Sequence, residues 1–76
     1  MKKGKYELEF ILRNNSQVEL AITSDCGKNK IKQIITNRNN EKIVFDLLED
    51  TEKIEFPVKN IGKRDLILKD IILRRI

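Results

Sequence analysis

The side chains of this 76-residue chain that are best suited to catalysis are carboxylate pairs and a few nucleophiles. The pairs are Glu7/Glu9, Glu49/Asp50 and Asp65/Asp70, and the nucleophiles are Ser16, Ser24 and Cys26. General acid–base catalysis needs a carboxyl group with a raised pKa in a desolvated pocket, which a solvated strand face does not provide. The chain also has no histidine to activate a hydroxyl or thiol group. We therefore predict that the protein is not an enzyme.

An acidic segment offers oxygen ligands, which calcium prefers. Its five carboxylates fall within ten residues, at Asp46, Glu49, Asp50, Glu52 and Glu55. They lack the D-x-D-x-D-G spacing of a calcium-binding loop. The single cysteine and the absence of histidine exclude an internal disulfide and a zinc knuckle. We expect a solvated acidic turn, with no metal and no cofactor.

The chain is basic, with 16 Lys and Arg residues against 12 Asp and Glu residues and a net charge of +4. Lysines gather in residues 28–32 and 59–64, and on one face they would neutralise phosphates. Single-strand binding also needs exposed aromatic rings. The four aromatic residues all fall at positions expected to face the core: Tyr6, Phe10, Phe45 and Phe56. Nucleic-acid binding is therefore the third hypothesis for function.

Asparagines at the expected turns, with basic residues beside them, are the best candidates for ligand contacts. Amides and charges of this kind hydrogen-bond sugar hydroxyls, although Asn-rich turns are usually only turns. The candidate ligand-binding residues are Asn37, Asn39, Asn40, Lys59, Asn60, Lys63 and Arg64. The chain has no tryptophan, so a ring platform for a sugar is missing unless Tyr6 is exposed.

The elements that position these side chains are strands, because apolar and polar residues alternate along most of the chain. The expected strands cover residues 5–13, 18–23, 30–36, 42–47, 53–59 and 65–75. In the first strand, Glu7 and Glu9 are expected to face water. A hairpin across Asn14-Asn15-Ser16 is the natural join between the first two strands.

Three details of the pattern make specific predictions. In the third strand, Ile31 and Ile35 would face the core and Ile34 would face outward. Proline cannot donate to a ladder, so Pro57 places its strand at a sheet edge or turns that position away from its neighbour. In the last strand the apolar parity shifts across Lys69-Asp70, which predicts a β-bulge.

Residues 41–50 and 65–75 are also compatible with helices. Ile43 and Leu47, for example, have i,i+4 spacing. Strands are favoured because Ile, Val and Phe lose rotamer freedom in helices and pack well in sheets. No stretch approaches the roughly 20 apolar residues of a membrane-spanning helix. The sequence predicts an all-β protein, a small antiparallel β-sandwich of about six strands forming one domain over residues 1–76.

Two stretches carry a family resemblance. Gly4-Lys5-Tyr6-Glu7-Leu8-Glu9-Phe10 resembles the G-x-Y-x-hydrophobic opening strand in the second half of carbohydrate-binding jelly-roll modules. Ile54-Glu55-Phe56-Pro57-Val58, Asn60-Ile61-Gly62 and the Asp70-Ile71-Ile72-Leu73 ending resemble their closing strands. The resemblance implies a β-sandwich accessory module that binds a glycan, usually attached to a larger secreted or surface enzyme. The chain would then match the latter part of such a module.

A second resemblance and an alternative function accompany the first. Phe56-x-Val58-Lys59-Asn60-x-Gly62 is similar to the F-x-V-x-N-x-G strand pair of immunoglobulin-like surface and cytoskeletal domains. The alternative function is protein interaction or assembly, because a small sandwich leaves long edges that find partners or self-associate. Four isoleucines outside the inward pattern would form the contact surface: Ile11, Ile34, Ile61 and Ile76.

Overall fold

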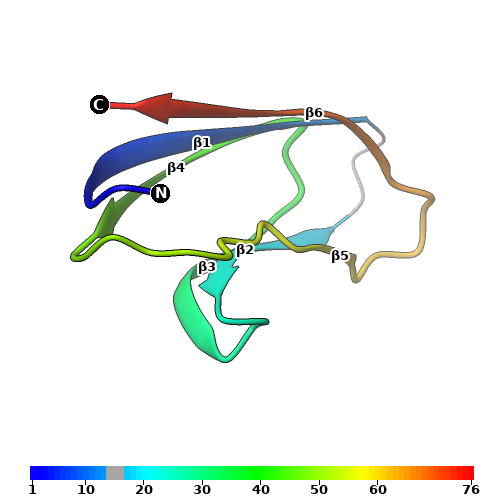
Figure 1. The fold of residues 1–76 in the computed structure, drawn as a ribbon. Coiled ribbons are helices and arrows are strands. Elements are labelled where there is room, and N and C mark those ends of the chain that lie inside the picture. The colour runs from blue at the N-terminus through cyan, green and yellow to red at the C-terminus, as the bar shows by residue number, and fades with distance from the viewer. Residues whose placement is uncertain (14–16) are drawn as a thin grey trace.

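The computed structural model, which describes residues 1–13 and 17–76, consists of two antiparallel three-stranded sheets packed face to face (Figure 1). One sheet has the order β4 (Asn40–Leu47), β1 (Gly4–Arg13), β6 (Ile67–Arg75). The other has the order β3 (Asn29–Thr36), β2 (Val18–Ser24), β5 (Val58–Asn60). The predicted all-β sandwich of six strands is confirmed, and strands occupy both stretches for which helices were the alternative.

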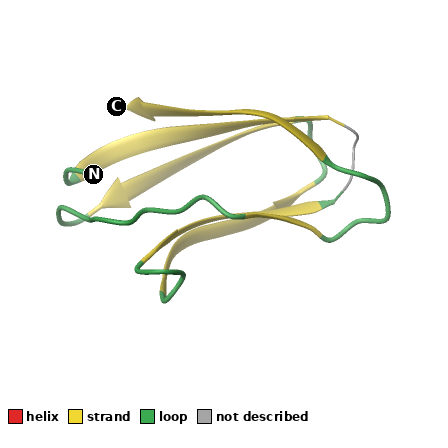
Figure 2. Ribbon diagram, turned by 45° about the vertical axis from the view of Figure 1, so that its right-hand side comes forward, coloured by secondary structure: helices red, strands yellow, loops and turns green. Residues whose placement is uncertain are grey.

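Most connections cross from one sheet to the other. β2 and β3 form a hairpin within one sheet, whereas β1 to β2, β3 to β4, β4 to β5 and β5 to β6 each change sheets (Figure 2). The predicted hairpin between the first two strands is therefore wrong, and its turn at 14–16 lies outside the described residues. Lys32 of β3 contacts β4, so β3 and β4 share one side of the sandwich and β5 and β6 share the other.

The two central strands and β4 supply the core by strict alternation, because alternate side chains of a strand point to the same face. Their fully buried members include Leu8 and Phe10 of β1 and Leu20 and Ile22 of β2. In β4, alternation buries Ile43, Phe45 and Leu47, and the inward position predicted for Phe45 is confirmed. Glu9 departs from its prediction: it faces outward but is only 7% exposed, because side chains from both neighbouring strands cover it.

The inward positions of β3 differ from simple alternation. The register runs from Ile22↔Lys32 to Thr23↔Lys30, so Ile31 is an extra residue in this strand. The resulting bulge lets Ile31 and Ile34 both pack against the core, three residues apart. Ile35 is 57% exposed, so the prediction that it faces the core, with Ile34 outward, is wrong.

A second bulge lies in β6, where the sequence predicts one. The register changes from Ile11↔Asp70 to Leu12↔Leu68, which leaves Lys69 without a partner on β1. On either side of Lys69, Leu68 and Ile71 therefore both share the face of the core residues of β1.

The fifth strand is much shorter than predicted, because β5 contains only three residues. Before it, Glu55 forms an isolated bridge with Thr23, and Pro57 accepts a bond from the Ala21 amide at 3.2 Å. The carbonyl of Pro57 therefore points toward β2. Because proline has no N–H, it cannot donate the second hydrogen bond of an antiparallel pair back to Ala21. The predicted edge position is confirmed, but the proline interrupts the ladder between Glu55 and β5.

Candidate functional site

The side of the sandwich formed by β5 and β6 is incompletely covered. Leu68, Ile71 and Leu73 of β6 lie opposite inward-facing residues of β1, so they face the interior between the sheets. Leu68 and Leu73 nevertheless remain 42% and 41% exposed. The strand on this side of the other sheet is β5, and it is not in contact with β6. The core therefore reaches the surface along β6.

The same strand presents an unpaired main-chain edge. Ile76 donates its amide to Lys5 O at 2.9 Å, so Ile76, Arg74 and Ile72 bond to β1 in the antiparallel alternation. The amides and carbonyls of Ile71 and Leu73 then point to the free edge. The Ile71 amide donates to Oδ1 of its neighbour Asp70 at 2.9 Å, a contact made within β6 itself. Among residues 1–13 and 17–76, the bond that an incoming strand would need to displace is this local one at Ile71.

The opposite edge of this sheet is protected by another strand. Lys32 of β3 donates its Nζ to the carbonyl of Val44 on the outer edge of β4, at 2.8 Å. A lysine on an edge carbonyl discourages strand addition, because another strand would have to remove a charged group. The two edges of the sheet therefore differ, and β6 is the more accessible one.

The outer face of this sheet carries an ion network centred on Arg74. Its Nη2 lies 2.9 Å from Glu9 Oε1, and its Nη1 lies 3.1 Å from Glu7 Oε1. Asn40 of β4 donates Nδ2 to the other oxygen of Glu9 at 2.9 Å. The Asn40 bond and then Arg74 hold the pKa of Glu9 below its usual value, and Glu9 raises the pKa of Arg74. These groups join β4 and β6 to β1, and we assign them a structural role.

The predicted ligand residues belong to the β3–β4 and β5–β6 connections and the strand residues beside them, and these two connections lie at the same end of the sandwich (Figure 1). They form two groups, because β3 and β4 are on one side of the central strands and β5 and β6 on the other. The first group is Asn37, Asn39 and Asn40, and the second is Lys59, Asn60, Lys63 and Arg64, all exposed. The structure therefore does not gather the seven residues into one cluster.

Two of the predicted amides have internal hydrogen bonds. Asn40 donates its side-chain amide to Glu9, as described above. Asn60 donates Nδ2 to Arg64 O at 2.8 Å and accepts the Gly62 amide at 3.0 Å. These bonds stabilise the conformation of the connection between β5 and β6, as asparagine side chains commonly do in turns. Asn37, Asn39, Lys59 and Lys63 are the members whose exposed side chains are better placed for a ligand.

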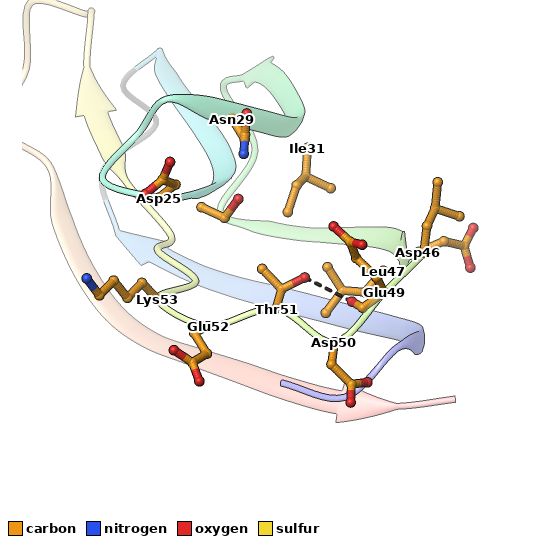
Figure 3. A pocket seen from close by; sticks show the side chains of 12 residues that line it. Asp25, Asn29, Ile31, Asp46, Leu47, Glu49, Asp50, Thr51, Glu52 and Lys53 are labelled. Atoms are coloured by element: carbon orange, nitrogen blue, oxygen red, sulfur yellow. Dashed lines mark hydrogen bonds between the residues drawn. The ribbon is translucent and has the colours of Figure 1, made fainter.

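A hollow of about 670 Å³ lies at the other end of the molecule (Figure 3). Residues 46–53 line it together with Ser24, Asp25, Asn29 and Ile31, and Thr51 donates its hydroxyl to Glu49 O at 2.9 Å. Its side chains include Asp46, Asp50 and Glu52, whose carboxylates do not converge in Figure 3. Among residues 1–13 and 17–76, no group of three acidic, cysteine or histidine side chains could hold a metal ion. The hollow is an open, acidic turn region.

Of the three candidate nucleophiles, Ser16 lies outside the described residues, and the other two have different surroundings. Cys26 is a free, exposed thiol in the β2–β3 turn, and Ser24 is buried at the end of β2. Tyr6 stacks on Phe45 with ring centroids 5.6 Å apart. Tyr6, Phe10 and Phe45 are buried and Phe56 is half-buried, so none presents an open ring face for stacking bases or sugars.

In the part of the chain that the structure describes, no helix is long and apolar enough to cross a membrane. No protein-family model matches the chain, and no curated protein and no solved structure matches it. The resemblances to carbohydrate-binding and immunoglobulin-like modules therefore stay predictions.

The open side is the feature that sequence reasoning identified least well. Of the four isoleucines expected to form a contact surface, Ile61 and Ile76 are exposed, Ile11 is half-buried and Ile34 packs against the core. Leu68 and Leu73 face inward but are uncovered. The nearest signal in the sequence is Pro57, which predicts that the strand on this side lies at a sheet edge.

Proposed function

We propose that this chain is a non-catalytic interaction module that binds a protein partner by accepting an additional strand along β6. The observation that carries the proposal is the exposure of Leu68 and Leu73 on the interior face of an edge strand. Strand addition joins main-chain hydrogen bonds, which give affinity, to side-chain pockets on alternate residues, which give specificity. β6 offers both, because the amides of Ile71 and Leu73 lie on the free edge and the apolar side chains lie beside them.

Peptide selection tests this proposal with a defined probe. A display library of short random peptides is selected against the immobilised chain, and binders are re-tested on two proline variants. Leu73→Pro removes an amide from the free edge of β6, and Val44→Pro removes one from the outer edge of β4. Neither amide bonds to β1, so the pair is matched. We expect binding to be lost in Leu73→Pro and kept in Val44→Pro. Equal binding to both variants would contradict the proposal.

Carbohydrate binding at the connection end is a second candidate function. It is supported by the exposure of Asn37, Asn39, Lys59 and Lys63, which lie in or beside the β3–β4 and β5–β6 connections. A glycan array probed with the chain is expected to show binding that Asn39→Ala or Lys63→Ala weakens. Absence of binding to every glycan would remove this candidate and leave the strand-addition proposal intact.

A further inference from the structure

We infer that the partner of β6 is a second copy of this chain, and that two β6 strands pair antiparallel about a two-fold axis at Ile72. The inference rests on the proposed function and adds the identity of the partner. The two three-stranded sheets that contain β6 would join into one continuous six-stranded sheet. A contact of this kind is isologous: each copy uses the same residues, and the assembly closes as a dimer.

The main-chain geometry allows this pairing. With Ile72 opposite Ile72 of the second copy, Ile71 lies opposite Leu73 and Leu73 lies opposite Ile71. Both residues have their amide and carbonyl on the free edge, so each of these two pairs can exchange both N–H···O bonds. Ile72 bonds to β1 of its own copy, and it occupies the non-hydrogen-bonded position between the two pairs.

Charge selects this register over its neighbours. With the axis at Ile72, Asp70 lies directly opposite Arg74 of the second copy, and both residues are on the outer face of the sheet. The pair occurs twice because of the symmetry, and opposite charges facing each other across strands are stabilising. An axis at Asp70 would place two aspartates face to face, and an axis at Ile71 or Leu73 would leave Asp70 opposite an apolar residue.

The apolar residues fit the same register on the interior face. Ile71 and Leu73 of one copy would lie against Leu73 and Ile71 of the other, at the place where each core reaches the surface. The like charges Lys69 and Arg75 come opposite each other only at the ends of the paired segment. The guanidinium of Arg75 lies over the Tyr6 ring, with its Cζ 5.8 Å from the ring centroid. Its Nη2 donates a hydrogen bond to Lys3 O at 3.2 Å.

Charge reversal tests the attraction between the copies. Sedimentation equilibrium is compared for the parent chain, Asp70→Lys and the matched control Asp46→Lys, which changes an exposed residue on β4. We expect a concentration-dependent dimer whose dissociation constant rises about tenfold or more in Asp70→Lys, since two attractive pairs become repulsive. The control should dimerise like the parent. A strict monomer at all concentrations, or equal effects of the two substitutions, would overturn the inference.

Cysteine cross-linking tests the register. In a Cys26→Ser background, Ile72→Cys would place two thiols at a non-hydrogen-bonded pair, where Cα atoms are about 4.5 Å apart and a disulfide can form. Asp70→Cys is the control, because its symmetry mate lies four residues along the strand, roughly 13 Å away. We expect rapid covalent dimerisation of the first variant only. Cross-linking of both variants at equal rates, or of the control alone, would contradict the register.

The two proposals fail in different ways. If the chain is a strict monomer but selected peptides still bind and depend on Leu73, the second-copy inference falls and strand addition stands. If dimers form but Leu73→Pro leaves them intact, another surface makes the dimer and the inference falls. If neither peptides nor a second copy engage β6, both proposals fall.

Discussion

Individual side chains on the outer face of the β4–β1–β6 sheet hold its strands together. One carboxylate oxygen of Glu9 accepts a hydrogen bond from Asn40 of β4, and the other forms an ion pair with Arg74 of β6. A carboxylate that is hydrogen-bonded on both oxygens is favoured in its charged form, which lowers its pKa. The sequence placed Glu9 correctly on the outer face, but its burial depends on residues 31 and 65 positions away, which alternation cannot reveal.

Acid is expected to weaken the fold through Glu9. Its folded-state pKa lies below its unfolded value, so its contribution is complete above about pH 4.3 and is lost as the pH falls through the folded-state pKa. Glu9→Gln should lower the free energy of unfolding at neutral pH and flatten its decline at acid pH, measured by urea denaturation at several pH values. Glu52→Gln, at an exposed turn position, is the control, and an identical acid response in both variants would contradict the role of Glu9.

Core aromatic residues are expected to differ in their contribution to stability. Phe10 is fully buried, so Phe10→Ala should cost about 3–5 kcal/mol in the free energy of unfolding. Phe56 is half-buried beside the interrupted ladder, so Phe56→Ala should cost clearly less. Thermal and urea denaturation measure both variants. A loss for Phe56→Ala as large as that for Phe10→Ala would show that the β5 side is packed more tightly than the structure indicates.

At the scale of elements, two bulges set which side chains reach the core. The one in β6 was visible in the sequence, because the apolar parity shifts across Lys69. The one in β3 was not, because Ile34 and Ile35 are both apolar and strict alternation chose the wrong one of them. Local pattern therefore predicts the strands well and fails where two neighbouring residues have the same chemistry.

Removal of the β6 bulge is expected to be tolerated. Without Lys69, Leu68 and Ile71 are two residues apart, so ordinary alternation keeps them opposite Leu12 and Phe10 on the core face. Deletion of Ile72 is the contrast, because it makes Ile71 and Leu73 neighbours and turns one of them to the outer face. That loss should resemble the truncation of a buried aliphatic residue, about 2–5 kcal/mol, and exceed the loss on deletion of Lys69. Urea denaturation compares the two, and a loss on deletion of Lys69 as large as that on deletion of Ile72 would contradict this reading of the register.

The whole molecule is a sandwich closed on one side and open on the other. On the closed side, Lys32 reaches from β3 to the edge of β4. On the open side, β5 is not in contact with β6, and Leu68 and Leu73 of β6 are uncovered. The sequence predicted the two-sheet class and the edge position of Pro57. It did not predict the open side, because coverage of β6 depends on which strand lies opposite it, a property of topology.

Amide hydrogen exchange along β6 tests the strand-accepting edge most directly. In dilute solution, the amides of Ile72 and Arg74, which bond to β1, should exchange slowly, and those of Ile71 and Leu73 should exchange faster. As protein concentration rises, or as a selected peptide is added, the amides of Ile71 and Leu73 should become protected and the alternation should disappear. Unchanged exchange at Ile71 and Leu73 under both conditions would contradict the account.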